Sequence, residues 1–154
     1  MVQLRGFMPL GCERIYKLIP RIKFDLINFG YKSKLKDEFK KGNIPLEKGF
    51  YGGKLDPKNA SLEHCKPHSK GGKNTLGNFV LATVENNNKR GNGDIFRYAT
   101  KENTEAYFKV FESCNIKDTK GTDYLKMLAK TLRELWEKSP IMKGKEMWEV
   151  LKRW

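Results

Sequence analysis

Residues 62–92 read LEHCKPHSKGGKNTLGNFVLATVENNNKRGN, and they contain both histidines of the chain, His64 and His68. The stretch begins in a β-prone segment and enters a loop, in which Pro67 and Gly71-Gly72 exclude regular structure. It continues through the apolar run FVLA into a helical segment that ends near a lysine, an arginine and a glycine. Polar side chains therefore stand at the end of a strand and within a helix, with a glycine-rich loop between them.

The segment before this stretch favours a β-hairpin. Residues 49–64, GFYGGKLDPKNASLEH, alternate short β-prone pieces with the turn residues DPKN. We therefore expect strands near Tyr51–Leu55 and Ala60–His64, followed by the loop and the helix, with Thr83 as the N-cap of the helix and Gly91 as its stop. A core of this size has little hydrophobic interior, so it needs a metal or flanking helices for stability.

Helices are predicted on both sides of a core at 49–93. In the amino-terminal region, 1–48, helical periodicity runs from about Gly11 to Gly42 with a stop at Gly30, and it includes a short basic helix at about Ser33–Lys41. The carboxy-terminal region, 94–154, carries two apolar stripes and a last helical segment. These contain Ala106, Tyr107, Val110, Phe111 and Cys114, then Tyr124, Leu125, Leu128, Leu132, Leu135 and Trp136, and finally Met147, Trp148, Leu151 and Trp154. We expect one compact unit in which these aromatic residues pack in the core rather than stack on nucleic acid.

The charge of the chain favours a polyanionic partner. The 154 residues include 31 lysines and arginines against 18 aspartates and glutamates, a formal charge of +13. Such a field attracts nucleic acid, although lysine also serves solubility. The chain has no apolar run long enough to span a bilayer and no leader-like start, so we expect a cytoplasmic protein without a membrane partner. Its three cysteines form no CxxC pair, which favours free, partly buried thiols.

Three side chains of the opening stretch can build a metal-assisted hydrolytic site. The Glu63 carboxylate is a hard oxygen ligand for Mg²⁺ or Mn²⁺, and the His64 imidazole can take a proton from water near neutral pH. Asparagine is a poor helix former, so the run at 86–88 suggests a compensating role, such as an amide oxygen that completes the metal site. An asparagine run is also typical of a fraying helix end.

The same residues carry a family resemblance. Glu63-His64, the loop from Pro67 to Gly72, Asn78 before FVL, and Asn87 before Lys89-Arg90-Gly91 closely resemble the motif of HNH endonucleases, which belong to the His-Me finger or ββα-metal superfamily. The match covers roughly residues 49–93. It implies an α+β protein with a small ββα-metal core of the H-N-N type, flanked by amino- and carboxy-terminal helices.

The resemblance also implies roles for these residues. His64 would be the general base, Asn78 would brace the loop that holds His64, and Glu63 with Asn87 would hold one Mg²⁺ or Mn²⁺ ion. The expected activity is hydrolysis of DNA phosphodiester bonds, with double-stranded DNA as the partner and a phage, mobile element or restriction-like system as the context. The cations near the site are expected to contact the DNA backbone: Lys66, Lys70, Lys73, Lys89 and Arg90. His68 is a possible accessory contact to metal or phosphate, or a plain loop residue.

One departure from the family and two alternatives complete the expectations. Many HNH proteins hold a structural zinc on two CxxC knuckles, which this chain lacks, so no structural zinc is expected and the flanking helices must supply stability. The first alternative is a DNA-binding module that keeps the HNH fold without activity. The second is a basic structural or partner-binding protein whose histidines and asparagines are incidental. The sequence leaves the oligomeric state and the cleavage specificity open.

Overall fold

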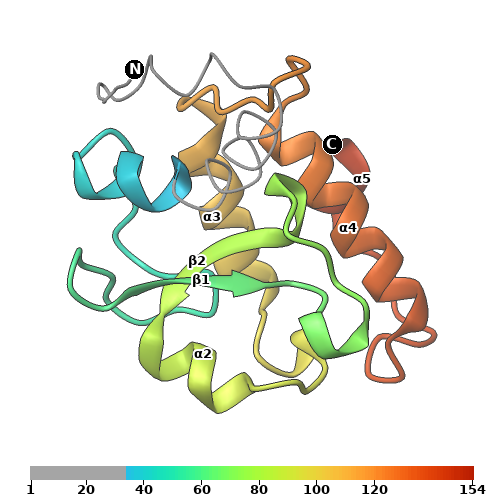
Figure 1. The fold of residues 1–154 in the computed structure, drawn as a ribbon. Coiled ribbons are helices and arrows are strands. Elements are labelled where there is room, and N and C mark those ends of the chain that lie inside the picture. Colours follow the sequence, from blue (N-terminus) through green and yellow to red (C-terminus); the bar gives the residue numbers. More distant parts are fainter. Residues whose placement is uncertain (1–33) are drawn as a thin grey trace.

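Residues 34–154 are described by a computed structural model, in which helices surround a small two-stranded antiparallel sheet (Figure 1). The sheet consists of β1 (Ala60–His64) and β2 (Phe79–Thr83), and the α-helices are α2 (Val84–Arg90), α3 (Lys101–Glu112), α4 (Tyr124–Lys138) and α5 (Glu149–Arg153). Short 3₁₀ helices lie at His68–Lys70 (η2), Leu76–Asn78 (η3) and Ile95–Arg97 (η4), and residues 34–40 are helical. The α+β class is confirmed. The predicted helix from Gly11 to Gly30 and Cys12 lie outside the described residues.

The predicted hairpin was wrong in its first strand. β1 pairs with β2 across the long loop, with Ala60 opposite Thr83 and His64 opposite Phe79. Residues 51–55 instead form a tight turn, because Gly52 and Gly53 both adopt positive φ and only an isolated bridge joins Lys48 to Lys54. The observed order is strand, loop, strand, helix. All five residues of β2 are buried, so the strand lacks the polar–apolar alternation by which a half-buried strand is detected in sequence.

The edge of β2 that does not face β1 has its backbone groups hydrogen-bonded by two tyrosine side chains and one backbone amide. The amide of Leu81 donates to the hydroxyl of Tyr107 (3.0 Å), and the hydroxyl of Tyr124 donates to the carbonyl of Phe79 (2.6 Å). The two hydroxyls lie 2.8 Å apart, and the amide of Phe50 donates to the carbonyl of Leu81. α3 and α4 supply these tyrosines, so they fix the sheet by hydrogen bonds as well as by packing.

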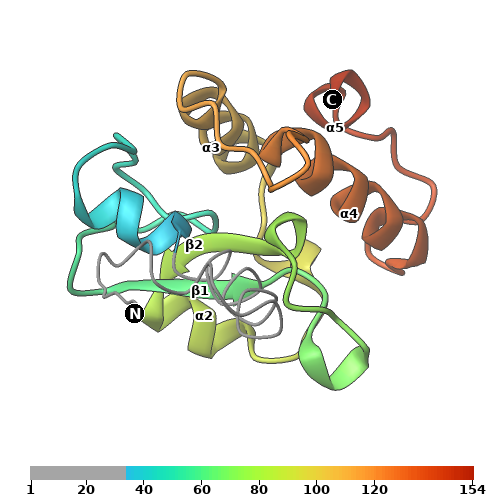
Figure 2. The same ribbon diagram turned by 45° about the horizontal axis from the view of Figure 1, so that its top comes forward.

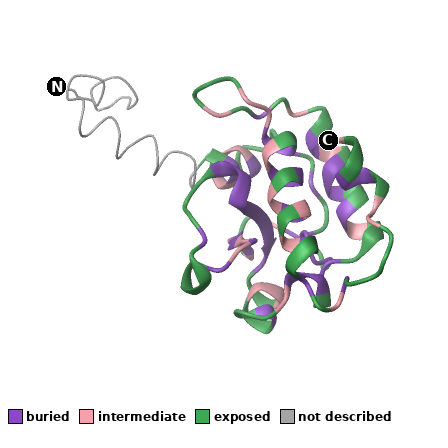
Figure 3. Ribbon diagram, turned by 90° about the vertical axis from the view of Figure 1, so that its right-hand side faces the viewer, coloured by how far each residue is buried: buried purple, intermediate pink, exposed green. Residues whose placement is uncertain are grey.

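The sheet lies between α2 on one side and α3 with α4 on the other (Figures 1 and 2). The buried faces of the helices turn toward the sheet and toward one another, and their exposed faces turn outward (Figure 3). One continuous hydrophobic core runs from Leu35 to Leu151. The predicted stripes on α3 and α4 supply much of this core, while the last helical segment is confirmed only over α5. None of the helices in residues 34–154 has the length and apolar content to cross a bilayer.

α2 begins and ends where the sequence predicted. The hydroxyl of Thr83 accepts a hydrogen bond from the amide of Asn86 (3.1 Å), and the amide of Gly91 donates to the carbonyl of Asn87 (3.1 Å). Because β2 leads directly into this cap, the helix starts where the strand ends. The asparagine run is therefore held against β1, at the face of the sheet opposite to α3 and α4.

Candidate active site

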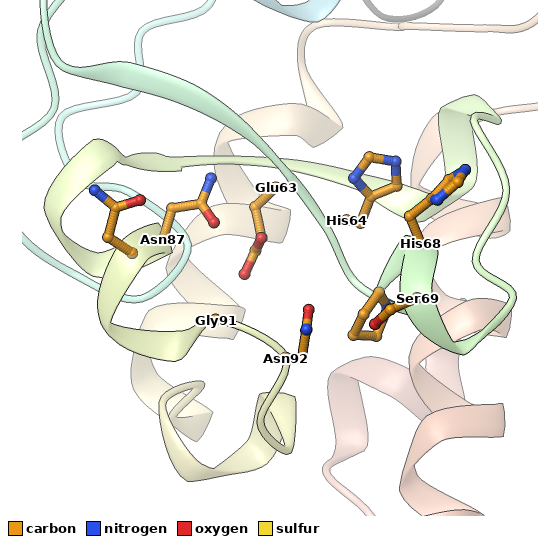
Figure 4. Close-up of a pocket in the computed structure, with 9 residues that line it drawn as sticks. Glu63, His64, His68, Ser69, Asn87, Gly91 and Asn92 are labelled. Carbon is orange, nitrogen blue, oxygen red and sulfur yellow. The ribbon is translucent and has the colours of Figure 1, made fainter.

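A pocket of about 510 Å³ is lined by four of the predicted site residues, Glu63, His64, His68 and Asn87 (Figure 4). Its polar lining comes from the end of β1, the loop after it, and α2 with the turn that follows. It includes Glu63, His64, His68, Asn87, Asn88 and Asn92. The strand and the helix are distant in sequence, and the antiparallel pairing of β1 with β2 places them beside one pocket.

His64 is held in one orientation by its neighbours. Its ring lies against Phe79, with 4.7 Å between ring centroids, and its Nε2 lies 2.8 Å from Oδ1 of Asn74. Because an amide oxygen only accepts hydrogen bonds, Nε2 carries the proton in this arrangement, and Nδ1 of the neutral ring is left as the proton acceptor. In the view of Figure 4 one ring nitrogen of His64 faces the side of Glu63 and the other faces His68. The arrangement suits a general base whose tautomer is fixed by its partner.

Glu63 points to the opposite face of β1 from His64, as neighbouring residues of a strand must. It is 5% exposed, and its Oε2 accepts hydrogen bonds from the Tyr51 hydroxyl (2.7 Å) and from the Arg90 guanidinium (3.0 Å). Burial raises the pKa of Tyr51 above its ordinary value, so the phenol stays protonated and donates to the carboxylate. The Glu63 charge is therefore compensated inside the protein while the side chain also borders the pocket.

Arg90 was predicted to contact nucleic acid, and the structure corrects this prediction. The residue is 5% exposed, and its guanidinium donates to Glu63 and to the carbonyls of His64 (2.7 Å) and Cys65 (2.9 Å). Burial alone would lower the pKa of Arg90, but Tyr51 and Glu63 raise it by more than burial lowers it. The pKa therefore lies above its ordinary value, and the guanidinium keeps its charge. The planar, five-donor group is used to join the end of α2 to the end of β1.

The three asparagines of α2 face different partners. The amide of Asn86 donates to the carbonyl of Gly52 (3.1 Å), and that of Asn87 donates to the hydroxyl of Ser61 (2.8 Å). Asn88 is exposed at the pocket. The run is therefore not a frayed end: Asn87 ties α2 to β1 and Asn86 ties it to the turn at residues 51–55, which offsets the poor helix propensity of asparagine.

Asn78 is buried, does not line the pocket, and holds the loop. Its Oδ1 accepts from the amide of Lys66 (2.8 Å), and its Nδ2 donates to the carbonyls of Lys66 (3.1 Å) and Lys73 (2.9 Å). The amide of Cys65 also donates to the Asn78 carbonyl (2.8 Å). One buried side chain thus joins the two ends of the loop that carries Pro67, His68 and Asn74.

The glycine pair of the loop has a steric cause. A Cβ at Gly72 would lie 1.8 Å from the carbonyl oxygen of Lys66, and Gly71 adopts a φ of +90° at the end of η2. The first constraint excludes any side chain, and the second disfavours an L-residue. The loop folds back on its own start, which brings Asn74 to His64.

The remaining predicted cations are on the surface. Lys70, Lys73 and Lys89 are exposed, Lys66 is half-buried, and Lys89 lies 3.7 Å from the exposed Glu85. Two residues of the site were missed by the sequence interpretation, Tyr51 and Asn74. Neither belongs to a regular spacing: Tyr51 was assigned to a strand, and Asn74 sits in a loop whose path is set by Asn78 and Gly72.

The donor atoms fit a small divalent cation. Within residues 34–154, the Glu63 carboxylate accepts its two hydrogen bonds through Oε2, and Asn87 donates through its amide nitrogen. Oε1 of Glu63 and Oδ1 of Asn87 therefore remain as hard oxygen donors beside one pocket. No group of three His, Cys, Asp or Glu residues gathers within that part of the chain. This donor set resembles Mg²⁺ sites, which commonly use few protein ligands and complete the shell with water and substrate phosphate.

The pocket thus combines an oriented imidazole, a carboxylate held by a buried arginine, and amide oxygens on a capped helix. Lysines with exposed or half-buried side chains lie on the loop that borders it. No protein-family model matches the chain, and neither does any curated protein or solved structure.

Proposed function

We propose that this protein is a divalent-metal-dependent endonuclease of the HNH type, with a ββα-metal core formed by β1, β2 and α2, and that it hydrolyses phosphodiester bonds of DNA. The observation that carries the proposal is that Glu63, His64 and Asn87 line one pocket although they come from a strand and a helix far apart in sequence. They are also the residues that the motif in the sequence assigns to metal and base.

In the proposed reaction, His64 acts as general base through Nδ1. It takes a proton from a water molecule whose oxygen attacks the phosphorus atom, while the bond from phosphorus to the 3′ oxygen breaks. The products carry a 5′ phosphate and a 3′ hydroxyl, and the departing oxygen takes a proton from solvent. Asn74 keeps the proton on Nε2, so the lone pair of Nδ1 remains available.

Glu63 and Asn87 would hold the Mg²⁺ or Mn²⁺ ion, whose charge would stabilise the negative charge that develops on the phosphate. Tyr51 and Arg90 hold the Glu63 carboxylate in place from its Oε2 side. Ser61 holds the amide nitrogen of Asn87, which fixes the direction of the amide oxygen.

The DNA backbone would be contacted by the lysines near the pocket, Lys66, Lys70, Lys73 and Lys89. The ring centroid of His68 lies 6.2 Å from that of His64, so His68 is near enough to contact the same phosphate.

A second candidate function is a DNA-binding module without activity. The observation in its favour is the buried pair of Glu63 with Arg90, which gives the carboxylate a structural partner within the protein. A residue retained for this ion pair needs no metal. The two candidates predict the same DNA binding and differ in cleavage.

Incubation with supercoiled plasmid in Mg²⁺ and in Mn²⁺ separates the two candidates, with EDTA and His64→Ala as controls. Metal-dependent nicking or linearisation that is lost in both controls would support the nuclease. Folded protein that shifts plasmid on a gel and cuts with neither metal would support the binding module. Mn²⁺ binding by calorimetry gives an independent readout: Glu63→Gln should weaken it at least tenfold, while Glu85→Gln on the exposed side of α2 should leave it unchanged.

A further inference from the structure

A second hollow lies directly beside the candidate active site. Its volume is about 450 Å³, and Pro67 lines both spaces. The loop after β1 forms one wall, and the carboxy-terminal end of α4 with Ser139 and Pro140 forms another. We call this space the flanking hollow. The flanking hollow borders α4, which contributes no residue to the pocket of His64.

Lysines from two separate elements border the flanking hollow. Lys66 and Lys70 come from the loop, and Lys138 comes from the last turn of α4. Within residues 34–154 none of the three forms an ion pair. The hollow also contains Arg90 and Asp94, but Arg90 is paired with Glu63, and the Asp94 carboxylate accepts hydrogen bonds from the amide of Phe96 (2.8 Å) and the hydroxyl of Ser139 (2.6 Å). Three lysines therefore face one carboxylate whose oxygens are already bonded.

The lining of the flanking hollow also includes apolar residues. These are Pro67, Ile95, Leu135 and Pro140, and Ile95 is buried in the core. A lining that combines cations with apolar side chains matches the chemistry of a nucleic-acid strand, whose phosphates are charged and whose sugars present apolar faces. A free phosphate ion would use the cations but would gain nothing from the apolar residues.

We propose that the flanking hollow binds the backbone of the DNA strand next to the bond that is cut, with Lys138 of α4 as a phosphate contact together with Lys66 and Lys70. The inference rests on the proposed function, because that function places the scissile phosphate at His64 on the other side of Pro67. It assigns substrate binding to α4, outside the part of the chain that carries the motif. The helical region after the core is thus a part of the binding surface as well as a packing partner.

The test compares two lysines in matched settings. Lys138 and Lys109 are both exposed and both lie in the last turn of an α-helix, on α4 and α3, and only Lys138 lines the flanking hollow. Each is changed to Ala in the full chain carrying His64→Ala, so that the DNA stays intact. Binding of a short fluorescein-labelled duplex is measured by anisotropy over a series of salt concentrations, and circular dichroism checks the fold.

We expect Lys138→Ala to weaken binding about fivefold and to reduce the salt slope by about one, because one phosphate contact is lost. Adding Lys70→Ala should reduce the slope by about two in total. Lys109→Ala should change neither quantity. Equal behaviour of Lys138→Ala and Lys109→Ala would overturn the inference, and so would competition by poly-glutamate as strong as that by unlabelled duplex, since the hollow would then accept any extended polyanion.

Plasmid cleavage by the same lysine variants with His64 intact separates the two proposals. Selective loss of binding in Lys138→Ala without any cleavage by the parent protein would support the hollow and reject the nuclease. Cleavage by the parent protein with unchanged binding in Lys138→Ala would support the nuclease and reject the hollow.

Discussion

The guanidinium of Arg90 lies 3.0 Å from the carboxylate of Glu63, and this buried ion pair joins α2 to β1 at the edge of the candidate active site. Arg90 also donates to the carbonyls of His64 and Cys65, so one side chain satisfies the backbone where β1 ends. Glu63, which precedes the proposed base, and Arg90, which follows the proposed metal ligand Asn87 on α2, are thus positioned by each other.

Removal of this arginine should destabilise the protein strongly. Arg90→Ala leaves the Glu63 charge buried and unpaired, so we expect the free energy of unfolding to fall by about 3–5 kcal/mol. Arg90→Lys keeps the charge but loses most of the donors, and it should recover only part of this loss. Urea unfolding followed by circular dichroism measures both. A loss below about 1 kcal/mol for Arg90→Ala would mean that the pair contributes as little as an exposed one.

Asn74 should act on catalysis through the orientation of His64. Asn74→Ala removes the acceptor of the Nε2 proton, and we expect plasmid nicking to slow by about 10- to 100-fold with little change in DNA affinity. Asn74→Asp keeps an oxygen acceptor and should restore most of the rate. Its added negative charge favours the protonated ring, so the acid limb of the pH–rate profile should move to higher pH. Equal rates and profiles for all three proteins would contradict a positioning role.

Asn78 should matter for the loop rather than for binding. Asn78→Ala removes three hydrogen bonds from a buried site, and we expect the protein to lose roughly 2–4 kcal/mol of stability. The exposed Asn88 on α2 provides a matched control, because Asn88→Ala should lie within about 0.5 kcal/mol of the parent. Hydrogen exchange should show faster exchange at the amides of Lys66 and Asn78 in the first variant. Unchanged exchange at Lys66 would contradict the bracing role.

Alkaline pH should unfold the protein through its buried acids. Burial raises the pKa of Cys65, Tyr51, Tyr107 and Tyr124, so the native state keeps these protons while the unfolded chain releases them at about pH 8.5 for cysteine and about pH 10 for tyrosine. The stability contributed by these groups is complete below about pH 8.5 and is lost as the pH rises, by up to about 1.4 kcal/mol per group and pH unit. Urea unfolding at increasing pH measures the loss. A flat profile between about pH 8 and pH 11 would refute it.

The sequence determined the local features of the fold. Thr83 and Gly91 bound α2 because capping depends on residues within one turn, and the apolar stripes of α3 and α4 are read directly from helical spacing. The sequence also singled out Glu63, His64 and Asn87, since carboxylate, imidazole and amide groups in this pattern suit one kind of chemistry. All three border one pocket.

Only the tertiary structure decided which strands pair and which charges face solvent. Residues 79–83, FVLAT, form β2 because Tyr107, Tyr124 and Phe50 hydrogen-bond to the edge of this strand that does not pair with β1. Those partners come from distant parts of the chain. Lys89 and Arg90 are neighbours in the sequence, yet Arg90 is buried and Lys89 is exposed. Successive residues of a helix point in directions that differ by about 100°, and only Arg90 points toward Glu63. Long-range contacts of this kind carry no local pattern, so the register of the sheet, the burial of Arg90 and the partner of His64 follow from the packing of the whole chain.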